Sequence, residues 1–108
     1  MTDETSGDRE SADGPTVLDD LFSTIEERKR ELPADSYTAS LFTHEKGENA
    51  VLEKIGEETT ETILAAKDDD DDELLYESGD LLYHLLVLLA MKDLDIDDLR
   101  EELESRFG

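Results

Sequence analysis

Apolar residues recur at helical spacing soon after the N-terminus. The first stripe follows the spacing i, i+3, i+4 and i+7 and consists of Leu18, Leu21, Phe22 and Ile25. This spacing predicts an amphipathic α-helix. Thr16 and Asp19 have the spacing of a capping box at its start, and Pro33 is expected to end the helix near Leu32.

Two longer helices are predicted after a loop. Residues 33–47 have turn formers at both ends and no sustained period, which predicts an ordered loop with about one helical turn. Helices are then expected over residues 48–67 and 73–91, with the acidic run 68–72 as the turn between them. The residues of the first of these helices expected to face inward are Val51, Leu52, Ile55, Ile63 and Ala66.

The last two helical segments predict how the chain assembles. A final helix is expected from Asp95, with Asp95 and Asp98 as caps. Its apolar stripe consists of Ile96, Leu99, Leu103 and Phe107. The helix before it is apolar on every side from Leu81 to Ala90, and such a helix must be covered all round. We therefore predict an all-α fold, a short helical bundle that is completed by dimerisation.

The composition predicts a single domain in a cytoplasmic protein. A chain of 108 residues with 36% hydrophobic residues has room for one domain with a modest core. Residues 1–16 are almost all polar and are expected to form a disordered acidic tail before a domain over residues 17–108. The chain has no cysteine and no signal-like apolar segment near its start, so we expect a cytoplasmic protein.

The charge excludes several classes of partner. The 32 acidic and 10 basic residues give a net charge of −22. Such a charge repels nucleic acid and anionic membranes, so neither is an expected partner. The longest apolar run, residues 81–90, is about half the length that spans a bilayer. Because molar salt screens self-repulsion within a few Å, the acidity also suits a protein from a salt-adapted cell.

Carboxylates form a pattern on the two long helices. Glu58 and Glu61 lie at i, i+3 on the first, and Glu77 and Asp80 lie at i, i+3 on the second. If these helices form an antiparallel hairpin that turns near Asp69, Glu61 comes level with Glu77, and Glu58 with Asp80. The same register places Lys54 level with His84.

A cation would explain this pattern. Two carboxylates separated by 5 to 6 Å repel by about 3 kcal/mol at an effective dielectric constant near 20. Ligation by oxygen alone favours Mg²⁺, or Mn²⁺, over zinc, and Mg²⁺ is commonly shared with substrate phosphates. A solvated acidic helix face is the alternative interpretation of the same residues. A di-iron site is set aside, because neither histidine lies three residues after a glutamate.

Several other residues have both a structural and a functional interpretation. Arg28 and Lys29 suit the negative end of the first helix, but they also belong to the densest basic cluster of the chain. The adjacent hydroxyls of Ser36, Tyr37 and Thr38 suit a turn or a phosphate or ribose contact. His84 on an apolar helix is more often a packing residue than a catalyst, and Lys54, level with it, suits either a surface charge or a substrate contact.

The sequence resembles the phosphoribosyl-ATP pyrophosphatase family, which belongs to the MazG-like all-α nucleotide pyrophosphohydrolases. The matching segments are IEERK (25–29), Pro33, SYTASLF (36–42), Gly47, KIGEETTE (54–61), AAK (65–67) and ESGDLLYHLLVLL (77–89). ExxE with ExxD alone would indicate only the wider superfamily. The SYT loop and DLLYHLL favour the narrower family, whose reaction belongs to histidine biosynthesis.

This resemblance implies a function and a site. It implies hydrolysis of phosphoribosyl-ATP to phosphoribosyl-AMP and pyrophosphate with bound Mg²⁺. The implied metal ligands are Glu58, Glu61, Glu77 and Asp80, with Glu57 as a further ligand or a base. The implied substrate contacts are Arg28, Lys29, Ser36, Tyr37, Thr38, Lys54 and Lys67. Two alternatives remain: a MazG-like hydrolase of other nucleoside triphosphates, and a non-enzymatic acidic helical protein that binds cations or a partner.

The charge leads to a first prediction. We expect the thermal midpoint of unfolding and the activity to rise from dilute buffer to molar KCl, because salt screens the repulsion within a chain of net charge −22. Thermal melts monitored by circular dichroism at both salt concentrations test this expectation. Equal midpoints in the two solutions would contradict the adaptation to salt.

Overall fold

The protein folds as five α-helices in a computed structural model that describes residues 16–107. The helices are α1 (Val17–Glu31), α2 (Tyr37–Phe42), α3 (Glu48–Lys67), α4 (Asp71–Met91) and α5 (Ile96–Phe107). No strand occurs in this described part, so the predicted all-α class is confirmed. The acidic tail predicted for residues 1–16 lies outside the described residues, apart from Thr16.

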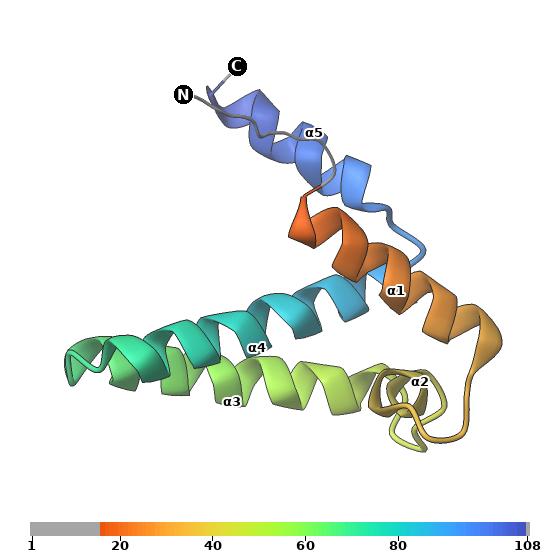
Figure 1. The fold of residues 1–108 in the computed structure, drawn as a ribbon, viewed down its shortest axis with the longest axis horizontal. Helices are drawn as coiled ribbons and strands as arrows, with labels where there is room; N and C mark the ends of the chain where they lie inside the picture. Colours follow the sequence, from red (N-terminus) through yellow and green to blue (C-terminus); the bar gives the residue numbers. More distant parts are fainter. Residues whose placement is uncertain (1–15, 108) are drawn as a thin grey trace.

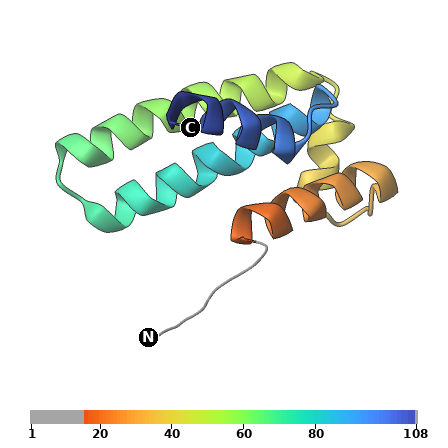
Figure 2. The ribbon, with the colours of Figure 1, turned by 90° about the horizontal axis from the view of Figure 1, so that it is seen from above.

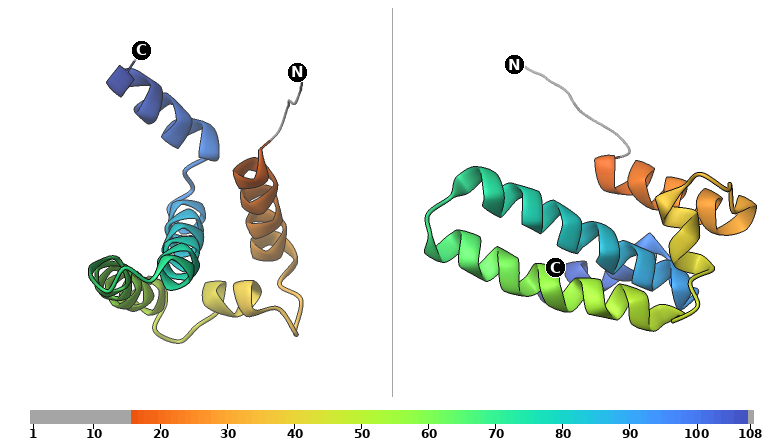
Figure 3. Two further views of the ribbon diagram at one scale, coloured as in Figure 1. Left: turned by 60° about the vertical axis from the view of Figure 1, so that its left-hand side comes forward. Right: turned by 90° about the horizontal axis from the view of Figure 1, so that it is seen from below.

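A long antiparallel hairpin of α3 and α4 forms the base of the molecule (Figure 1). The short helix α2 lies at the open end of this hairpin, far from the turn that joins α3 to α4. Helix α1 packs on the C-terminal half of α4, and α5 leads away from the hairpin beside the start of α1 (Figures 1 and 3). Figure 2 shows how far the hairpin extends beyond α1 and α2.

The ends of α1 follow the capping prediction. The Asp19 backbone N–H donates to the Thr16 hydroxyl at 3.3 Å, and the Thr16 backbone N–H donates to the Asp19 carboxylate at 3.0 Å. These reciprocal bonds form the predicted capping box. At the other end, Leu32 adopts a left-handed conformation with φ 49°, and its N–H donates to the Arg28 carbonyl. This closes α1 before Pro33, as predicted.

The α3–α4 turn is shorter than the sequence suggests. The side chain of Asp70 accepts a hydrogen bond from the Glu73 backbone N–H at 3.1 Å, so Asp70 is the N-cap of α4. Asp71 and Asp72 therefore belong to the first turn of α4 and not to the connection. Their charges suit the positive end of the helix, which explains why an acidic run can start a helix.

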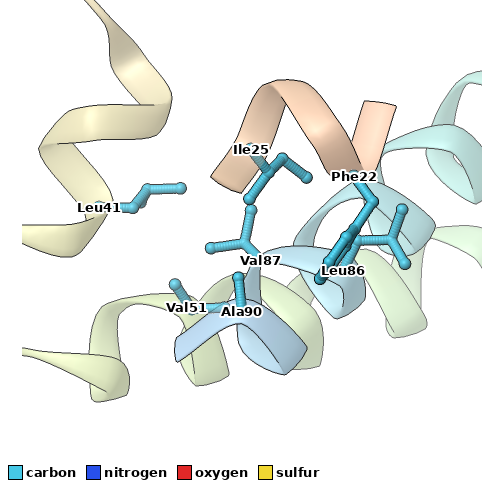
Figure 4. Packing of buried hydrophobic residues seen from close by; sticks show 7 residues of the cluster. All are labelled: Phe22, Ile25, Leu41, Val51, Leu86, Val87 and Ala90. Atoms are coloured by element: carbon cyan, nitrogen blue, oxygen red, sulfur yellow. The ribbon is translucent and has the colours of Figure 1, made fainter. Parts of the chain in front are cut away.

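The core is small and lies where α1, α2, α3 and α4 meet (Figure 4). Its central cluster consists of Phe22, Ile25, Leu41, Val51, Leu86, Val87 and Ala90. The predicted inward positions Val51 and Ile55 of α3 are respectively buried and partly buried. Leu52, Ile63 and Ala66 were also predicted to face inward, which is wrong for the single chain, because all three are exposed.

The reason for this error is that the inner face of α3 is not purely apolar. The α3 residues that are buried or partly buried beyond Val51 are Ile55, Glu58, Thr62 and Ala65. They recur at three- and four-residue intervals and so share with Val51 one helix face, which therefore contains both apolar and polar side chains. A prediction from apolar periodicity alone therefore chose Leu52, Ile63 and Ala66, which lie one position after residues of the true inner face.

Helix α4 has more apolar surface than one chain covers. By length and mean hydropathy it could cross a membrane, yet Leu86, Val87 and Ala90 are fully buried against the rest of the domain. Only 28% of its most apolar 18-residue stretch is buried within the chain. Leu82 and Leu85 stay over a third exposed. We interpret α4 as a core helix with one uncovered face.

Helix α5 has few contacts with the rest of the chain. The Asp95 backbone N–H donates to the Asp98 carboxylate at 2.8 Å, which confirms the predicted capping pair. Of the predicted stripe, Ile96 and Leu99 are partly buried, whereas Leu103 and Phe107 are 50% and 81% exposed. The last two residues of the stripe stay exposed because α5 extends beyond α1 (Figure 1).

An ion pair between Asp19 and Arg100 joins the start of α1 to α5. The backbone N–H of Thr16, followed by Arg100, lowers the pKa of Asp19 to about 2. The folded state therefore favours the ionised carboxylate. The resulting stability is complete above the ordinary pKa of aspartate and disappears as the pH falls toward 2.

We predict that Asp19→Asn unfolds at a lower temperature than the wild type at pH 6, and that the difference narrows between about pH 4 and pH 2. Thermal melts of both proteins over this pH range provide the measurement. The exposed neighbour substitution Asp20→Asn is the matched control. A difference that stays constant down to pH 2 would show that the Asp19 charge does not hold α1 and α5.

Candidate active site

The four carboxylates of the ExxE and ExxD motifs lie along the middle of the α3–α4 hairpin. Glu58 and Glu77 are buried, with 7% and 5% of their surface exposed. Asp80 is partly buried and Glu61 is exposed. Glu57, on the adjacent position of α3, is exposed. The hairpin thus brings two buried carboxylates into a domain whose other buried side chains are almost all apolar.

Glu77 is the most strained of these groups electrostatically. Burial, followed by the neighbouring carboxylates of Glu73 and Glu61, raises its pKa to about 7. Its buried Oε1 atom has no hydrogen-bond partner within residues 16–107. An ionised carboxylate without a partner is costly in such a place. The influence of Glu61 on Glu77 agrees with the predicted register, in which these two residues are level.

Glu58 has a histidine as its hydrogen-bond partner. Its Oε1 atom lies 2.8 Å from Nδ1 of His84, which is itself buried. His84 stands one helical turn after Asp80, the residue that we expected opposite Glu58. The His84 ring contacts Glu58 and Tyr37, whereas Lys54, which the predicted register places level with His84, is exposed.

The chemistry of these side chains suits a hard cation, and their positions can be compared with those of a metal site. Within residues 16–107 no three His, Asp or Glu side chains converge at metal-binding distance. The donors are nevertheless all carboxylate oxygens, and the unpartnered Oε1 of Glu77 lies among other acidic groups. These properties fit Mg²⁺ or Mn²⁺, which bind oxygen ligands and complete their shells with water and phosphate.

A pocket beside α2 collects most of the predicted substrate contacts. Its volume is about 570 Å³, and Arg28, Ser36, Tyr37 and Thr38 line it. Arg28 reaches it from the end of α1, where the guanidinium also pairs with Glu27 at 2.9 Å. The folding of the SYT segment as α2 therefore brings three hydroxyl side chains and one cation around the same cavity.

A second, smaller pocket lies on the other side of Tyr37. Its volume is about 180 Å³, and Tyr37 and the predicted Lys54 line it together with Ser40, His44 and Lys46. The sequence analysis did not select the last three residues, because they lie in a segment without periodicity. Lys46 pairs with Glu53 at 3.0 Å across the pocket wall.

Two predicted substrate contacts lie elsewhere. The ammonium group of Lys29 donates to the Ala90 carbonyl and to the Asp93 carboxylate, both at 2.7 Å, and so fixes α1 on the end of α4. Lys67 is exposed at the turn of the hairpin, at the opposite end from α2 (Figure 1). Within one chain the structure brings neither residue to the pocket of Arg28 and Tyr37.

An all-α hairpin with ExxE on one helix and ExxD on the facing helix is the arrangement of the MazG-like class of nucleotide pyrophosphohydrolases. The family model described as phosphoribosyl-ATP pyrophosphohydrolase matches residues 18–107. This match covers α1 to α5 almost completely. The chain belongs to the phosphoribosyl-ATP pyrophosphohydrolase family.

Close relatives carry the same family name. The chain is 72% identical to a phosphoribosyl-ATP pyrophosphatase of Haloarcula marismortui over 89% of its length and 98% of that protein. It is 70% identical to the one of Natronomonas pharaonis, over 87% of this chain and 93% of the relative. These relatives come from halophilic archaea, which agrees with the salt adaptation inferred from the charge. A relative from Methanococcoides burtonii is 52% identical over 84% of this chain and 92% of that protein.

The environment of Glu77 leads to a third prediction. We expect Glu77→Gln to stabilise the metal-free protein at pH 8, because a neutral amide avoids burial of a charge. Between about pH 4.5 and pH 7 the Glu77 carboxyl is protonated in the folded wild type but ionised in the unfolded chain. The wild type should therefore lose stability relative to the variant as the pH rises through this range.

Thermal melts in EDTA over this pH range measure the effect, with Glu104→Gln on α5 as a control at an exposed glutamate. A Glu77→Gln variant that is less stable than the wild type at pH 8 would show that the ionised carboxylate has a favourable partner in the metal-free fold.

Proposed function

We propose that this protein hydrolyses phosphoribosyl-ATP to phosphoribosyl-AMP and pyrophosphate, an early reaction of histidine biosynthesis. The observation that carries the proposal is the pair of carboxylate motifs on the two helices of the α3–α4 hairpin, with a buried Glu77 oxygen that has no partner among the residues that the structure describes. The family match and the halophilic relatives support the same substrate. We further propose that the reaction takes place in the cytoplasm, without nucleic acid or membrane partners.

Mg²⁺, or Mn²⁺ in its place, is the proposed cofactor. Glu58, Glu61, Glu77 and Asp80 would hold it, since they supply only oxygen ligands and two of them are buried. When bound, the ion would offset the negative charge of the phosphates and lower the pKa of a bound water. Binding would also offset the burial and the neighbouring carboxylates that raise the pKa of Glu77.

The two pockets beside α2 are the proposed place of the substrate. Arg28 and Lys54 line them from opposite sides of Tyr37 and offset phosphate charge in a strongly acidic protein. The hydroxyls of Ser36 and Thr38 line the larger pocket and would contact a phosphate or a ribose, in addition to the bonds that they form with the Ala39 backbone N–H and the Tyr83 hydroxyl. Lys29 and Lys67 remain predicted substrate contacts, but neither lines these pockets within one chain. Lys29 would have to leave its bonds at the end of α4, and Lys67 would have to reach the substrate from the hairpin turn.

The proposed reaction breaks the bond between the α- and β-phosphates. The water oxygen forms a bond to the α-phosphorus, pyrophosphate leaves with the electrons of the broken bond, and a carboxylate accepts the water proton. The exposed Glu57 next to Glu58 is a candidate for this base, because solvent water reaches its carboxylate.

We propose that the working form is a homo-oligomer, most simply a dimer. Leu82 and Leu85 of α4 and Leu52 and Ile63 of α3 are exposed on a hairpin that otherwise forms the core. An exposed apolar surface of this kind marks an interaction site in a soluble protein. A second hairpin would cover it and complete a four-helix bundle.

The metal ligands give a fourth prediction. Glu58→Ala and Asp80→Ala should each reduce Mg²⁺-dependent pyrophosphate release by more than about 100-fold, beyond the effect typical of residues that only support a ligand. Turnover is measured on phosphoribosyl-ATP and on a panel of nucleoside triphosphates, with Glu101→Ala on α5 as the control. Near-normal turnover in both variants would place the metal elsewhere, and a preference for another triphosphate would favour a different MazG-like hydrolase.

The exposed hairpin surface gives a fifth prediction. We expect the protein to sediment as a dimer or a larger species at micromolar concentration in molar KCl, and Leu85→Arg to shift it toward the monomer. Val17→Arg, which adds the same charge to an exposed residue at the start of α1, is the matched control. A folded monomeric wild type at this concentration would refute the assembly.

A further inference from the structure

The ring of His84 connects the carboxylate site to the short helix α2. Its Nδ1 atom lies 2.8 Å from Glu58 Oε1 and 3.0 Å from the backbone oxygen of Asp80. Its Nε2 atom lies 3.2 Å from the hydroxyl of Tyr37. The ring is 4% exposed, and both of its nitrogens have protein partners. One side chain thus contacts residues of α2, α3 and α4.

The partners define the direction of these hydrogen bonds. A carboxylate and a backbone carbonyl can only accept, so Nδ1 carries the proton and donates to Glu58 and Asp80. In the neutral ring, Nε2 then has a lone pair and accepts from the Tyr37 hydroxyl. The chain of donors runs from Tyr37 through His84 to Glu58, and each member restricts the orientation of the next.

A second contact repeats the link between α2 and α4. The hydroxyls of Thr38 and Tyr83 form a hydrogen bond, so two consecutive residues of α2 contact two consecutive residues of α4. The Tyr83 ring packs edge-on against the His84 ring, with centroids 4.8 Å apart and an angle of 70°. These contacts join α2 to α4, and Leu41 packs the same six-residue helix into the core.

We propose that His84 is a positioning residue that couples the two halves of the site: through Nδ1–H it orients Glu58, and through Nε2 it holds Tyr37 and with it α2. This inference rests on the proposed function, in which Glu58 is a metal ligand and Tyr37 lines the substrate pockets. In this proposal, the His84 ring influences both the position of α2 and the orientation of the Glu58 carboxylate.

A purely structural role would have a simpler solution. A leucine or methionine at position 84 would continue the apolar sequence of α4 and would pack in a similar volume. It would, however, leave the buried Glu58 carboxylate without its donor and Tyr37 without its acceptor. A packing role therefore predicts a change in stability alone, whereas a positioning role predicts separate changes in metal affinity and in KM.

The experiment uses His84→Leu, His84→Asn, Tyr37→Phe and the double variant His84→Asn/Tyr37→Phe in molar KCl. Mn²⁺ binding to the metal-free proteins is measured by electron paramagnetic resonance of free Mn²⁺, without substrate. KM and kcat for phosphoribosyl-ATP are measured at saturating Mg²⁺. Tyr76→Phe, at an exposed tyrosine nearer the hairpin turn, is the matched control.

The inference gives a separate result for each variant. His84→Leu should weaken Mn²⁺ binding by roughly 10-fold or more, as loss of a group that supports a ligand does. His84→Asn retains an N–H donor near the position of Nδ1, so its Mn²⁺ affinity should stay within about threefold of the wild type. It should instead raise KM as much as Tyr37→Phe does. The double variant should raise KM no further than either single change, because both remove the same link.

Two outcomes separate the inference from the function on which it rests. If Glu58→Ala loses Mn²⁺ binding while both His84 variants bind Mn²⁺ and substrate like the wild type, His84 only packs and the inference is overturned. If Glu58→Ala binds Mn²⁺ like the wild type, the metal assignment itself is wrong and the inference falls with it. If His84→Leu does not fold, His84→Asn and Tyr37→Phe still decide, since unchanged KM in both overturns the coupling.

Discussion

Two carboxylates, Glu58 and Glu77, are buried together with His84 in a small domain whose other buried side chains are apolar, and the free energy of burying the carboxylate charge shapes the site. Glu58 has a hydrogen-bond donor in His84. Glu77 has an oxygen without a partner in the described part of the chain, and its pKa is raised to about 7 by burial and by nearby acids. A fold that keeps an unpaired charge at such a place does so at the expense of stability, which is typical of functional sites. A bound cation is the simplest compensation.

The same constraint explains why the hairpin is long and exposed. The motif carboxylates extend over one helical turn on each of α3 and α4, and the remaining apolar residues of α4 then have too few neighbours within one chain. The domain stabilises one end of the hairpin through the core around Val51 and Val87. The rest of the hairpin surface stays free for a partner, so site and assembly depend on the same two helices.

The sequence predicted the long helices well and their inner faces less well. Turn residues on both sides made the start and end of α3 predictable, and the Thr16–Asp19 pair did the same for α1. Apolar periodicity failed for Leu52 and Ile63, because the inner face of α3 includes the polar Glu58. Periodicity counts hydrophobic residues and cannot anticipate a buried carboxylate.

The candidate site shows the same division. The motif spacing and the loop hydroxyls were visible in the sequence, and the structure places Arg28 and the SYT residues around one pocket. The contacts of His84 were not predictable, because they depend on the register of α3 against α4 to within one turn and on where α2 docks. Lys29 shows the opposite case, since its position in the sequence suggested a substrate contact but its ammonium group joins α1 to α4.

The central claim is that the carboxylates of the α3–α4 hairpin bind a divalent cation, and the most direct measurement is a crystal structure with Mn²⁺ at its absorption edge. The account predicts an anomalous peak between α3 and α4 with carboxylate oxygens of Glu58, Glu61, Glu77 and Asp80 around it, at roughly 2.0 to 2.3 Å, as expected for a small hard divalent ion. A peak only among the exposed acids of the hairpin turn, with Glu77 still unpartnered, would contradict the account.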